Sequence, residues 1–93
     1  MSTIVSDPGK PNRTLSEQEY RDRLRELPPS AKLVAKILEI DGPLSQGQLA
    51  EESLLPDRTV RYALNRLEET GLVQSRYSVQ DARKQVYSLT DRS

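Results

Sequence analysis

Apolar residues recur at helical spacing in the stretch 15–27, where they form one stripe. Ser16 followed three residues later by Glu19 is a capping box, which predicts the start of this helix. Pro28 and Pro29 predict its end, because proline disfavours helical backbone in the residue before it. The stripe consists of Leu15, Tyr20, Leu24 and Leu27.

Three further helices are predicted between residues 29 and 70. The second helix spans about 29–41, has a wide apolar face and ends before Gly42. The third is short, about 46–53, with Ser45 as its N-cap and Gln48 at the capping-box position. A tight turn then leads into the fourth helix, about 57–70.

After these helices, residues rich in Val and Tyr predict two short strands, 72–77 and 85–89. Between them lies the polar stretch 78–84, so the pair is predicted to be a hairpin. The order helix–helix–short helix–turn–helix–hairpin predicts a mainly α fold with a small β-hairpin. This is a winged helix-turn-helix with an extra N-terminal helix.

Composition removes several classes of function. The 93 residues include no Cys and no His, which excludes zinc fingers, imidazole acid–base catalysis and thiol nucleophiles. We therefore expect no enzyme, no metal and no cofactor. The absence of Cys favours a reducing cytoplasm, and no apolar run approaches the ~18 residues of a membrane span. We expect a cytoplasmic protein with no membrane contact.

The fourth helix divides into two faces. Val60, Ala63, Leu64 and Leu67 share one side, which predicts a core-facing stripe. The other side and its flanks carry guanidinium, amide, phenol and hydroxyl groups, which are the types that bond base edges and phosphates in the DNA major groove. Fourteen basic residues balance fourteen acidic ones over the chain, but residues 58–66 include three Arg and no acid. The candidate DNA-reading residues are Arg58, Thr59, Arg61, Tyr62, Asn65 and Arg66. The alternative is an ordinary solvated helix face.

Two further groups of residues are candidate DNA contacts. The wing 78–84 and the strand before it supply Arg76, Asp81, Arg83 and Lys84, and an Arg on a projecting loop suits the minor groove or the adjacent backbone. The alternative is a charged tip that keeps a strand edge soluble. Ser45 and Gln46, at a helix N-terminus, are candidates for a phosphate contact.

The apolar framework of Leu49, Ala50, Leu55, Val60 and Ala63 resembles that of the winged-helix domain in MarR-type transcription regulators. The stretches 64–73, Asp81–Ala82–Arg83 and Ser88–Leu89–Thr90 are similar to the end of the family's recognition helix, its wing and its last strand. The likeness is greatest to small regulators common in halophilic archaea. It implies sequence-specific binding of double-stranded DNA, with Arg83 in the minor groove and Asp81 orienting it. Leu54 stands where many helix-turn-helix motifs have a turn glycine.

These observations divide the chain into a flexible tail at 1–14, an accessory helix at 15–27 and a DNA-binding domain at 28–93. The stripe of the accessory helix packs either on its own domain or on a second protomer; we expect a homodimer. No small-molecule effector is evident. Two alternative functions use the same fold: a winged helix that binds proteins, and a plasmid or viral replication or copy-control protein that binds DNA.

Overall fold

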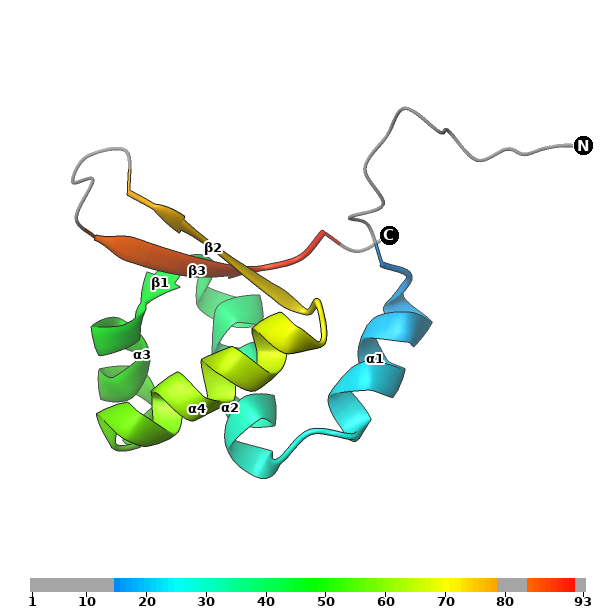
Figure 1. Cartoon of the computed structure of the whole chain (residues 1–93), viewed down its shortest axis with the longest axis horizontal. Coiled ribbons are helices and arrows are strands. Elements are labelled where there is room, and N and C mark those ends of the chain that lie inside the picture. Colours follow the sequence, from blue (N-terminus) through cyan, green and yellow to red (C-terminus); the bar gives the residue numbers. More distant parts are fainter. Residues whose placement is uncertain (1–14, 79–83, 92–93) are drawn as a thin grey trace, which may run out of the picture.

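The computed structural model describes residues 15–78 and 84–91. In these residues four helices and three short strands follow one another, and α4 lies in front of α2 in the view of Figure 1. No helix in this part of the chain is long and apolar enough to cross a membrane. The elements are α1 (Glu17–Arg25), α2 (Pro29–Asp41), β1 (Leu44–Ser45), α3 (Gln46–Ser53), α4 (Asp57–Glu69), β2 (Val73–Tyr77) and β3 (Gln85–Leu89).

Two of the helices begin with the capping boxes that the sequence predicts. The Ser16 hydroxyl accepts a hydrogen bond from the Glu19 backbone N–H at 3.0 Å, and the Ser16 N–H donates to the Glu19 carboxylate at 3.1 Å. Ser45 and Gln48 make the same pair of bonds at the start of α3, at 3.2 and 2.9 Å. Each box satisfies two N–H groups that a helix start leaves without partners.

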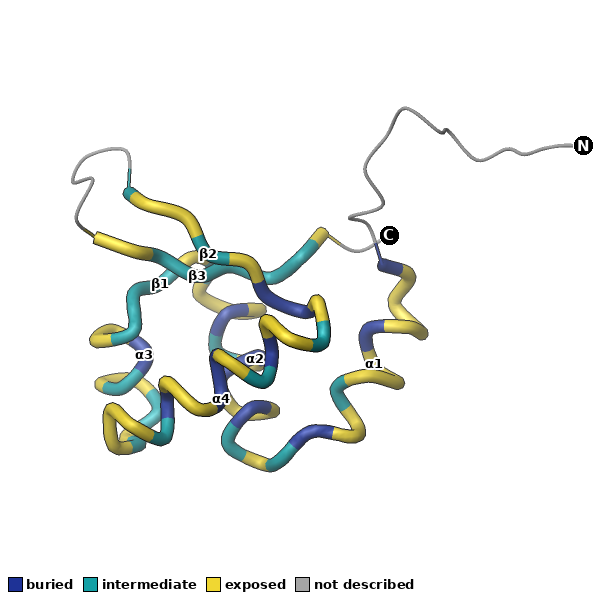
Figure 2. Tube along the Cα trace, in the orientation of Figure 1, coloured by how far each residue is buried: buried dark blue, intermediate teal, exposed yellow. Residues whose placement is uncertain are grey.

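The core forms where α2 and α4 pack against each other. Both helices turn their buried faces inward, and α3 and the sheet close the core on either side, so the dark-blue segments of Figure 2 converge at its centre. Ala31 and Ala35 are fully buried, which lets the backbones approach closely, while the larger side chains fill the space beside them. The largest fully buried side chains are Val34, Leu49, Val60, Leu64, Leu67 and Leu72.

The sheet has the strand order β1–β3–β2 and is antiparallel throughout. The hairpin of β2 and β3 pairs Val73 with Leu89 at one end and Tyr77 with Gln85 at the other. The sequence predicted this hairpin and missed β1, in which Leu44 and Ser45 pair with β3. A strand of two residues, the second of which is also the N-cap of α3, is too short to show an alternating pattern. Four helices around this small sheet make a winged helix-turn-helix.

The apolar stripe of α1 is covered by its own chain. Leu15, Tyr20 and Leu27 are buried in the same cluster as the α2–α4 core, and Leu24 packs against that cluster half-buried. The Leu15 N–H also donates to the carbonyl of Asp91, 2.9 Å away, just beyond β3. Of the two packings that the sequence left open for this stripe, the structure has the one on its own domain, and not the one on a second protomer. The winged helix uses α1 to close its own core.

Candidate nucleic-acid interface

The outer face of α4 carries most of the candidate DNA-reading residues. Val60, Ala63, Leu64 and Leu67 are buried, which turns the opposite side of this 13-residue helix to solvent. The six candidate DNA-reading residues of α4 differ in how far their side chains are exposed to solvent. Arg58, Arg61, Tyr62 and Asn65 are exposed, whereas Thr59 and Arg66 are half-buried.

Arg66 is less available than the sequence suggested. Its Nε is buried and lacks a hydrogen-bond partner within the described part of the chain. The aliphatic stem of an arginine can cover apolar surface while its charged end stays close to water, which fits a half-buried residue with a buried Nε. We therefore regard Arg66 as a flanking residue, and the central outer face of α4 belongs to Arg58, Tyr62 and Asn65.

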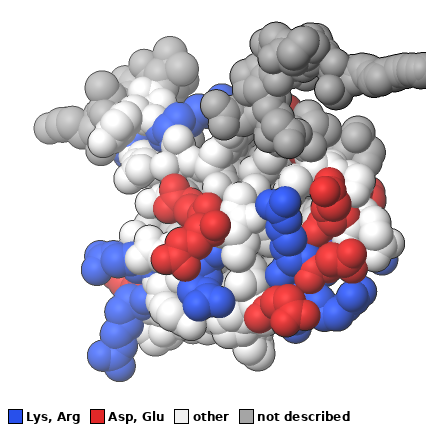
Figure 3. Space-filling model, turned by 45° about the vertical axis from the view of Figure 1, so that its right-hand side comes forward, with Lys and Arg blue, Asp and Glu red and all other residues white. Residues whose placement is uncertain are grey.

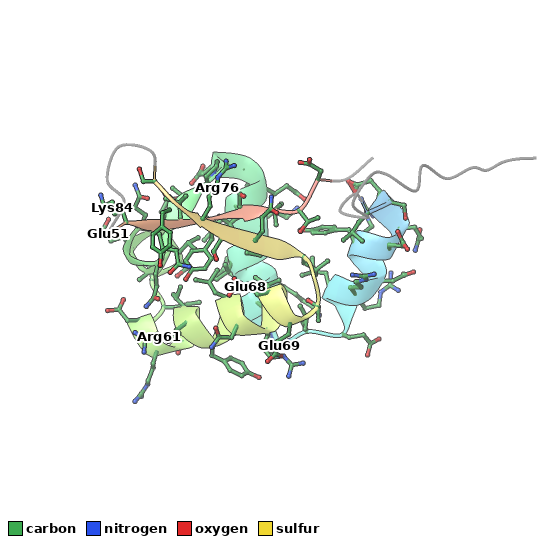
Figure 4. All side chains as sticks on the ribbon, turned by 45° about the horizontal axis from the view of Figure 1, so that its top comes forward. Glu51, Arg61, Glu68, Glu69, Arg76 and Lys84 are labelled. Carbon is green, nitrogen blue, oxygen red and sulfur yellow. The ribbon has the colours of Figure 1, made fainter. Side chains whose placement is uncertain are left out.

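Charge is distributed unevenly along α4. The first half carries the exposed residues Asp57, Arg58 and Arg61, and the second half carries the exposed Glu68 and Glu69 together with the half-buried Arg66. In Figure 4, Arg61 lies near the start of α4, and Glu68 and Glu69 lie near its end. In Figure 3, basic side chains gather at the lower left, over the start of α4, with acidic side chains beside them. The first half of α4 therefore has one net positive charge and the second half one net negative charge, an order that favours a phosphate backbone beside the first half.

A tight turn at Leu54 sets the angle between α3 and α4. Leu54 caps α3 in the left-handed conformation, with φ of 63°, and its N–H donates to the carbonyl of Ala50 at 2.9 Å. Glycine adopts this conformation without the steric cost that a side chain brings. The Leu54 side chain is 88% exposed, so no apolar contact offsets that cost.

The two basic residues in the described part of the wing, Arg76 and Lys84, lie apart from the basic residues of α4. Arg76 is exposed on β2, one residue away from the half-buried Ser75, and strand alternation puts it on the sheet face that points away from the helices. Figure 4 shows Arg76 on the far side of the sheet from Arg61. Lys84 is exposed where the hairpin closes, and its carbonyl accepts the N–H of Ser78 at 2.7 Å. Asp81 and Arg83 lie outside the described residues.

The two candidates for a phosphate contact already have partners in the chain. The Ser45 hydroxyl accepts the Gln48 N–H in the capping box, and Ser45 also pairs with Val86 in the sheet. The Gln46 amide donates to the carbonyl of Asp57 at 3.5 Å. The Gln46 bond joins the start of α3 to the start of α4, and the Ser45 pairing joins the start of α3 to β3. Ser45 and Gln46 therefore orient the helix-turn-helix, whatever else they contact.

One contact with α4 was not predicted from the sequence. The Arg23 guanidinium of α1 donates to the carbonyl of Thr70, 2.8 Å away, where α4 ends. The Thr70 hydroxyl donates to the carbonyls of Arg66 and Leu67, at 3.0 and 3.1 Å. The pattern of α1 shows Arg23 as one of several polar residues, and no sequence signal distinguishes it from its neighbours.

Two ionisable groups near the interface have shifted pKa values. Burial raises the pKa of the Tyr87 phenol on β3, and the Glu68 carboxylate raises it further, while Arg61 acts in the opposite direction. A hydrogen bond with the Asp41 carboxyl raises the pKa of Glu52 on α3. Among residues 15–78 and 84–91, no three His, Cys, Asp or Glu side chains are grouped to hold a metal ion.

Comparison with known proteins places this geometry in a family. The sequence model that describes the MarR family matches residues 26–84, which include all of α2, α3, α4 and β2. The chain belongs to the MarR family. No curated protein matches the sequence.

Solved structures of transcription regulators share the fold of this MarR-family chain. The regulator PA4135 superposes with a TM-score of 0.66 and 27% identity over 78% of this chain and 55% of its own. Reduced AbfR, solved bound to DNA, superposes with a TM-score of 0.64 and 28% identity over 80% of this chain and 55% of its own. Tm0710 from Thermotoga maritima superposes with a TM-score of 0.67 and 24% identity over 80% of this chain and 54% of its own. At this identity the likeness shows the fold alone. The chain spans about half the length of these regulators.

Proposed function

We propose that this MarR-family chain binds double-stranded DNA sequence-specifically and regulates transcription. The observation that carries the proposal is the exposed outer face of α4, where Arg58, Tyr62 and Asn65 point away from the core in a winged helix-turn-helix. The similarity to AbfR, whose structure contains DNA, supports it. A protein-binding winged helix would instead be expected to expose an apolar patch on this face.

In the proposed complex the first half of α4 enters the major groove. A helix of 13 residues is about 20 Å long and fits the groove. Arg58 bonds a guanine through two nitrogens, and Asn65 bonds an adenine through its amide. Arg61 and the flanking Thr59 and Arg66 contact phosphates, and Tyr62 packs on the base edges. Glu68 and Glu69 lie at the end of α4 that leaves the groove.

The wing supplies the second group of contacts. Lys84 lies where the hairpin closes, and in the proposed complex it contacts the DNA backbone, with Arg83 in the minor groove and Asp81 orienting that arginine. Arg76 faces away from α4, so it reaches DNA only if the duplex follows the outer face of the sheet. These contacts position the protein and add affinity that depends on salt.

Two finer assignments are part of the proposal. One is the likeness to small regulators of halophilic archaea, which stays a prediction. The other is self-association: a single module buries only ~600–1,000 Å² on DNA, which limits its affinity and favours a homodimer. The α1 stripe does not supply that contact, because the chain's own core covers it.

The test begins with a selection of bound sequences from random duplexes by the wild-type chain. A defined motif is expected, and Arg58→Ala or Asn65→Ala should weaken binding to it roughly 5–150-fold and relax the preference at one base pair each. Arg21→Ala is the matched control, because it removes an equal charge from an exposed position on α1. The proposal is wrong if no motif is enriched, or if Arg58→Ala and Asn65→Ala bind the selected site like the wild type.

A further inference from the structure

Helices α1 and α2 border a surface groove of about 660 Å³. Tyr20 is buried and Leu24 is half-buried, so these two residues of α1 form an apolar floor for the groove. They are four residues apart, which places them one above the other on the same side of α1. A floor of this kind can receive a row of apolar side chains. We call this feature the α1–α2 groove.

Basic side chains stand along both borders of the α1–α2 groove. Arg21 and Arg25 are exposed on α1, and Lys32 and Lys36 are exposed on α2. In each pair the two residues are four apart, so they share one side of their helix, with about 5–6 Å between their Cβ atoms. The apolar floor therefore has a row of two cations on either side, and each row is about one helical turn long.

Acidic residues neutralise only part of this charge. The lining has four basic residues and two acidic ones, although the chain as a whole has no net charge. The acidic residues of the lining are Glu17 and Glu39. Lys36 and Arg25 form ion pairs with carboxylates of their own helices, at 3.0 and 3.2 Å. Within residues 15–78 and 84–91, Arg21 and Lys32 form no ion pair. One cation on each border can therefore pair with a carboxylate from another molecule.

Two exposed apolar residues of α2 adjoin the row of lysines. Ile40 is 73% exposed and Leu33 is 39% exposed. Lys36 comes three residues after Leu33 and four before Ile40, so the three side chains are neighbours on the helix. Exposed apolar side chains beside a groove are typical of a surface that binds protein. A DNA backbone would gain nothing from Leu33, Ile40 or the apolar floor, which makes a protein segment the better occupant for this combination of groups.

We propose that the α1–α2 groove binds a helical segment of another protein, one whose apolar stripe lies between two acidic flanks. The apolar stripe packs on Tyr20 and Leu24, and carboxylates on the two flanks pair with Arg21 on one border and Lys32 on the other. A helix suits the groove because its side chains repeat once per turn, as both rows of cations do. The charges select an acidic segment over a neutral or basic one and speed its association.

The groove lies apart from the part of α4 that carries the candidate DNA-reading residues. In Figure 1, α1 is on the opposite side of the molecule from α3 and from the start of α4. None of the residues that line the groove belongs to α3, α4 or the sheet. A segment in the groove and a duplex along the first half of α4 can therefore be bound at the same time, and the groove can be tested without DNA.

Fluorescence anisotropy with a defined peptide tests the groove directly. The probe is a labelled helical peptide of about 14 residues with leucines at i, i+4 and i+7 and glutamates along both flanks. The full chain should bind it saturably, and the double variant Arg21→Ala, Lys32→Ala should bind it about tenfold more weakly while its circular dichroism stays that of the folded chain. The double variant Arg58→Ala, Arg61→Ala is the matched control, because it removes an equal charge from exposed positions on α4. Absence of saturable binding, or equal binding by the two double variants, overturns the proposal.

Exchange of charges between the chain and the peptide tests the ion pairs. The variant Arg21→Glu, Lys32→Glu should lose the glutamate peptide and bind a second peptide in which lysines replace the glutamates. The wild type should show the opposite preference. If the variant does not prefer the lysine peptide, carboxylates do not pair with Arg21 and Lys32, and the proposal is overturned.

Three further measurements separate the proposed segment from other occupants of the groove. Alanines in place of the leucines should abolish binding of the peptide to the wild type, and a peptide that binds equally well without leucines would show attraction by charge alone. A random DNA duplex, or phenylacetate as a small anion with an apolar body, is added to the complex at constant ionic strength. The peptide should stay bound in both cases. Its displacement by the duplex would assign the groove to a phosphate backbone, and its displacement by phenylacetate would assign it to a small acid; each of these three results overturns the proposal.

Discussion

The guanidinium of Arg23 caps the end of α4 by donating to the carbonyl of Thr70, 2.8 Å away and 47 residues later in the chain. Carbonyls at a helix C-terminus lack partners within the helix and carry partial negative charge. A cation from α1 therefore binds where α4 needs one. Immediately afterwards Gly71 turns the chain, with φ of 79°. A Cβ there would lie 3.1 Å from the Arg23 nitrogen, so glycine and arginine fit together.

Loss of this contact should loosen the end of α4. We expect Arg23→Ala to lower the free energy of unfolding by about 1 kcal/mol, because a charge-assisted bond contributes more than a neutral one but this one is solvent-exposed. Urea denaturation measures it. The control is Arg25→Ala, which removes only an exposed ion pair with Asp22 on the same helix and should change stability little. Equal effects of the two substitutions would show that Arg23 does not cap α4.

Truncation in α1 tests whether this helix belongs to the core. Leu27 is 4% exposed in the central cluster, so Leu27→Ala should cost about 2–4 kcal/mol in the free energy of unfolding, through lost burial and the cavity left behind. Leu54→Ala, at an exposed position, should cost close to nothing by the same measurement. Leu24→Glu should also destabilise the fold, because its side chain packs half-buried on the cluster. Folded Leu27→Ala protein of unchanged stability would show that α1 docks only loosely.

The turn of the helix-turn-helix offers a stabilising substitution. A non-glycine residue in the left-handed conformation costs about 1–2 kcal/mol, and an exposed side chain gains little in return. Leu54→Gly should therefore raise the free energy of unfolding by about 0.5–1 kcal/mol, after the entropy that glycine loses on folding is deducted. Thermal unfolding checks this, with Leu54→Val expected to destabilise because β-branched residues tolerate this conformation poorly. A lower melting temperature for Leu54→Gly would mean that the leucine makes a contact in solution.

Stability should depend on the ionisation of Tyr87 at high pH. Burial raises its pKa in the folded state above the ordinary value near 10, so folding favours the neutral phenol. This contribution is fully present below pH 10 and is lost as the pH rises through the folded-state pKa. Thermal unfolding between pH 8 and pH 11 should show a steeper decline for the wild type than for Tyr87→Phe. Parallel curves for the two proteins would exclude Tyr87 as the responsible group.

The sequence predicted the elements whose pattern is local. The capping pairs Ser16–Glu19 and Ser45–Gln48 mark helix starts within four residues, and the two faces of α4 follow from the spacing of Val60 and Leu64. The contacts missed join residues far apart in sequence. Arg23 is one of several exposed arginines until the fold brings it to Thr70, and β1 exists only because β3 pairs with it.

The same distinction holds for the candidate interface. Helical periodicity identified which residues of α4 face outward. It gives the direction of each side chain around the helix axis, but it does not give how deeply the side chain is buried. It therefore did not reveal that Arg66 has a buried Nε, while Asn65 beside it is exposed. Strand alternation alone places Arg76 on one of two faces, and the pairing with β3 and the helices decides which. The covering of the α1 stripe was likewise a choice between two packings, and only the folded core decides it.

The wing can be tested through the salt dependence of binding. Each phosphate contact releases counterions, so log K falls with log salt by about 0.9 per contact, and removing a contact flattens the slope by that amount. We expect the double variant Arg83→Ala, Lys84→Ala to weaken binding to all duplexes and to reduce the slope by about one or two. Titrations of one selected duplex and one unrelated duplex over a range of ionic strength give both quantities. Arg21→Ala on α1 should leave the slope as it is, and an unchanged slope in the double variant would show that the wing does not touch DNA. Arg76→Ala then decides which side of the sheet the duplex follows: a reduced slope places the backbone along the outer face, and an unchanged slope confines it to the end of the hairpin that carries Lys84.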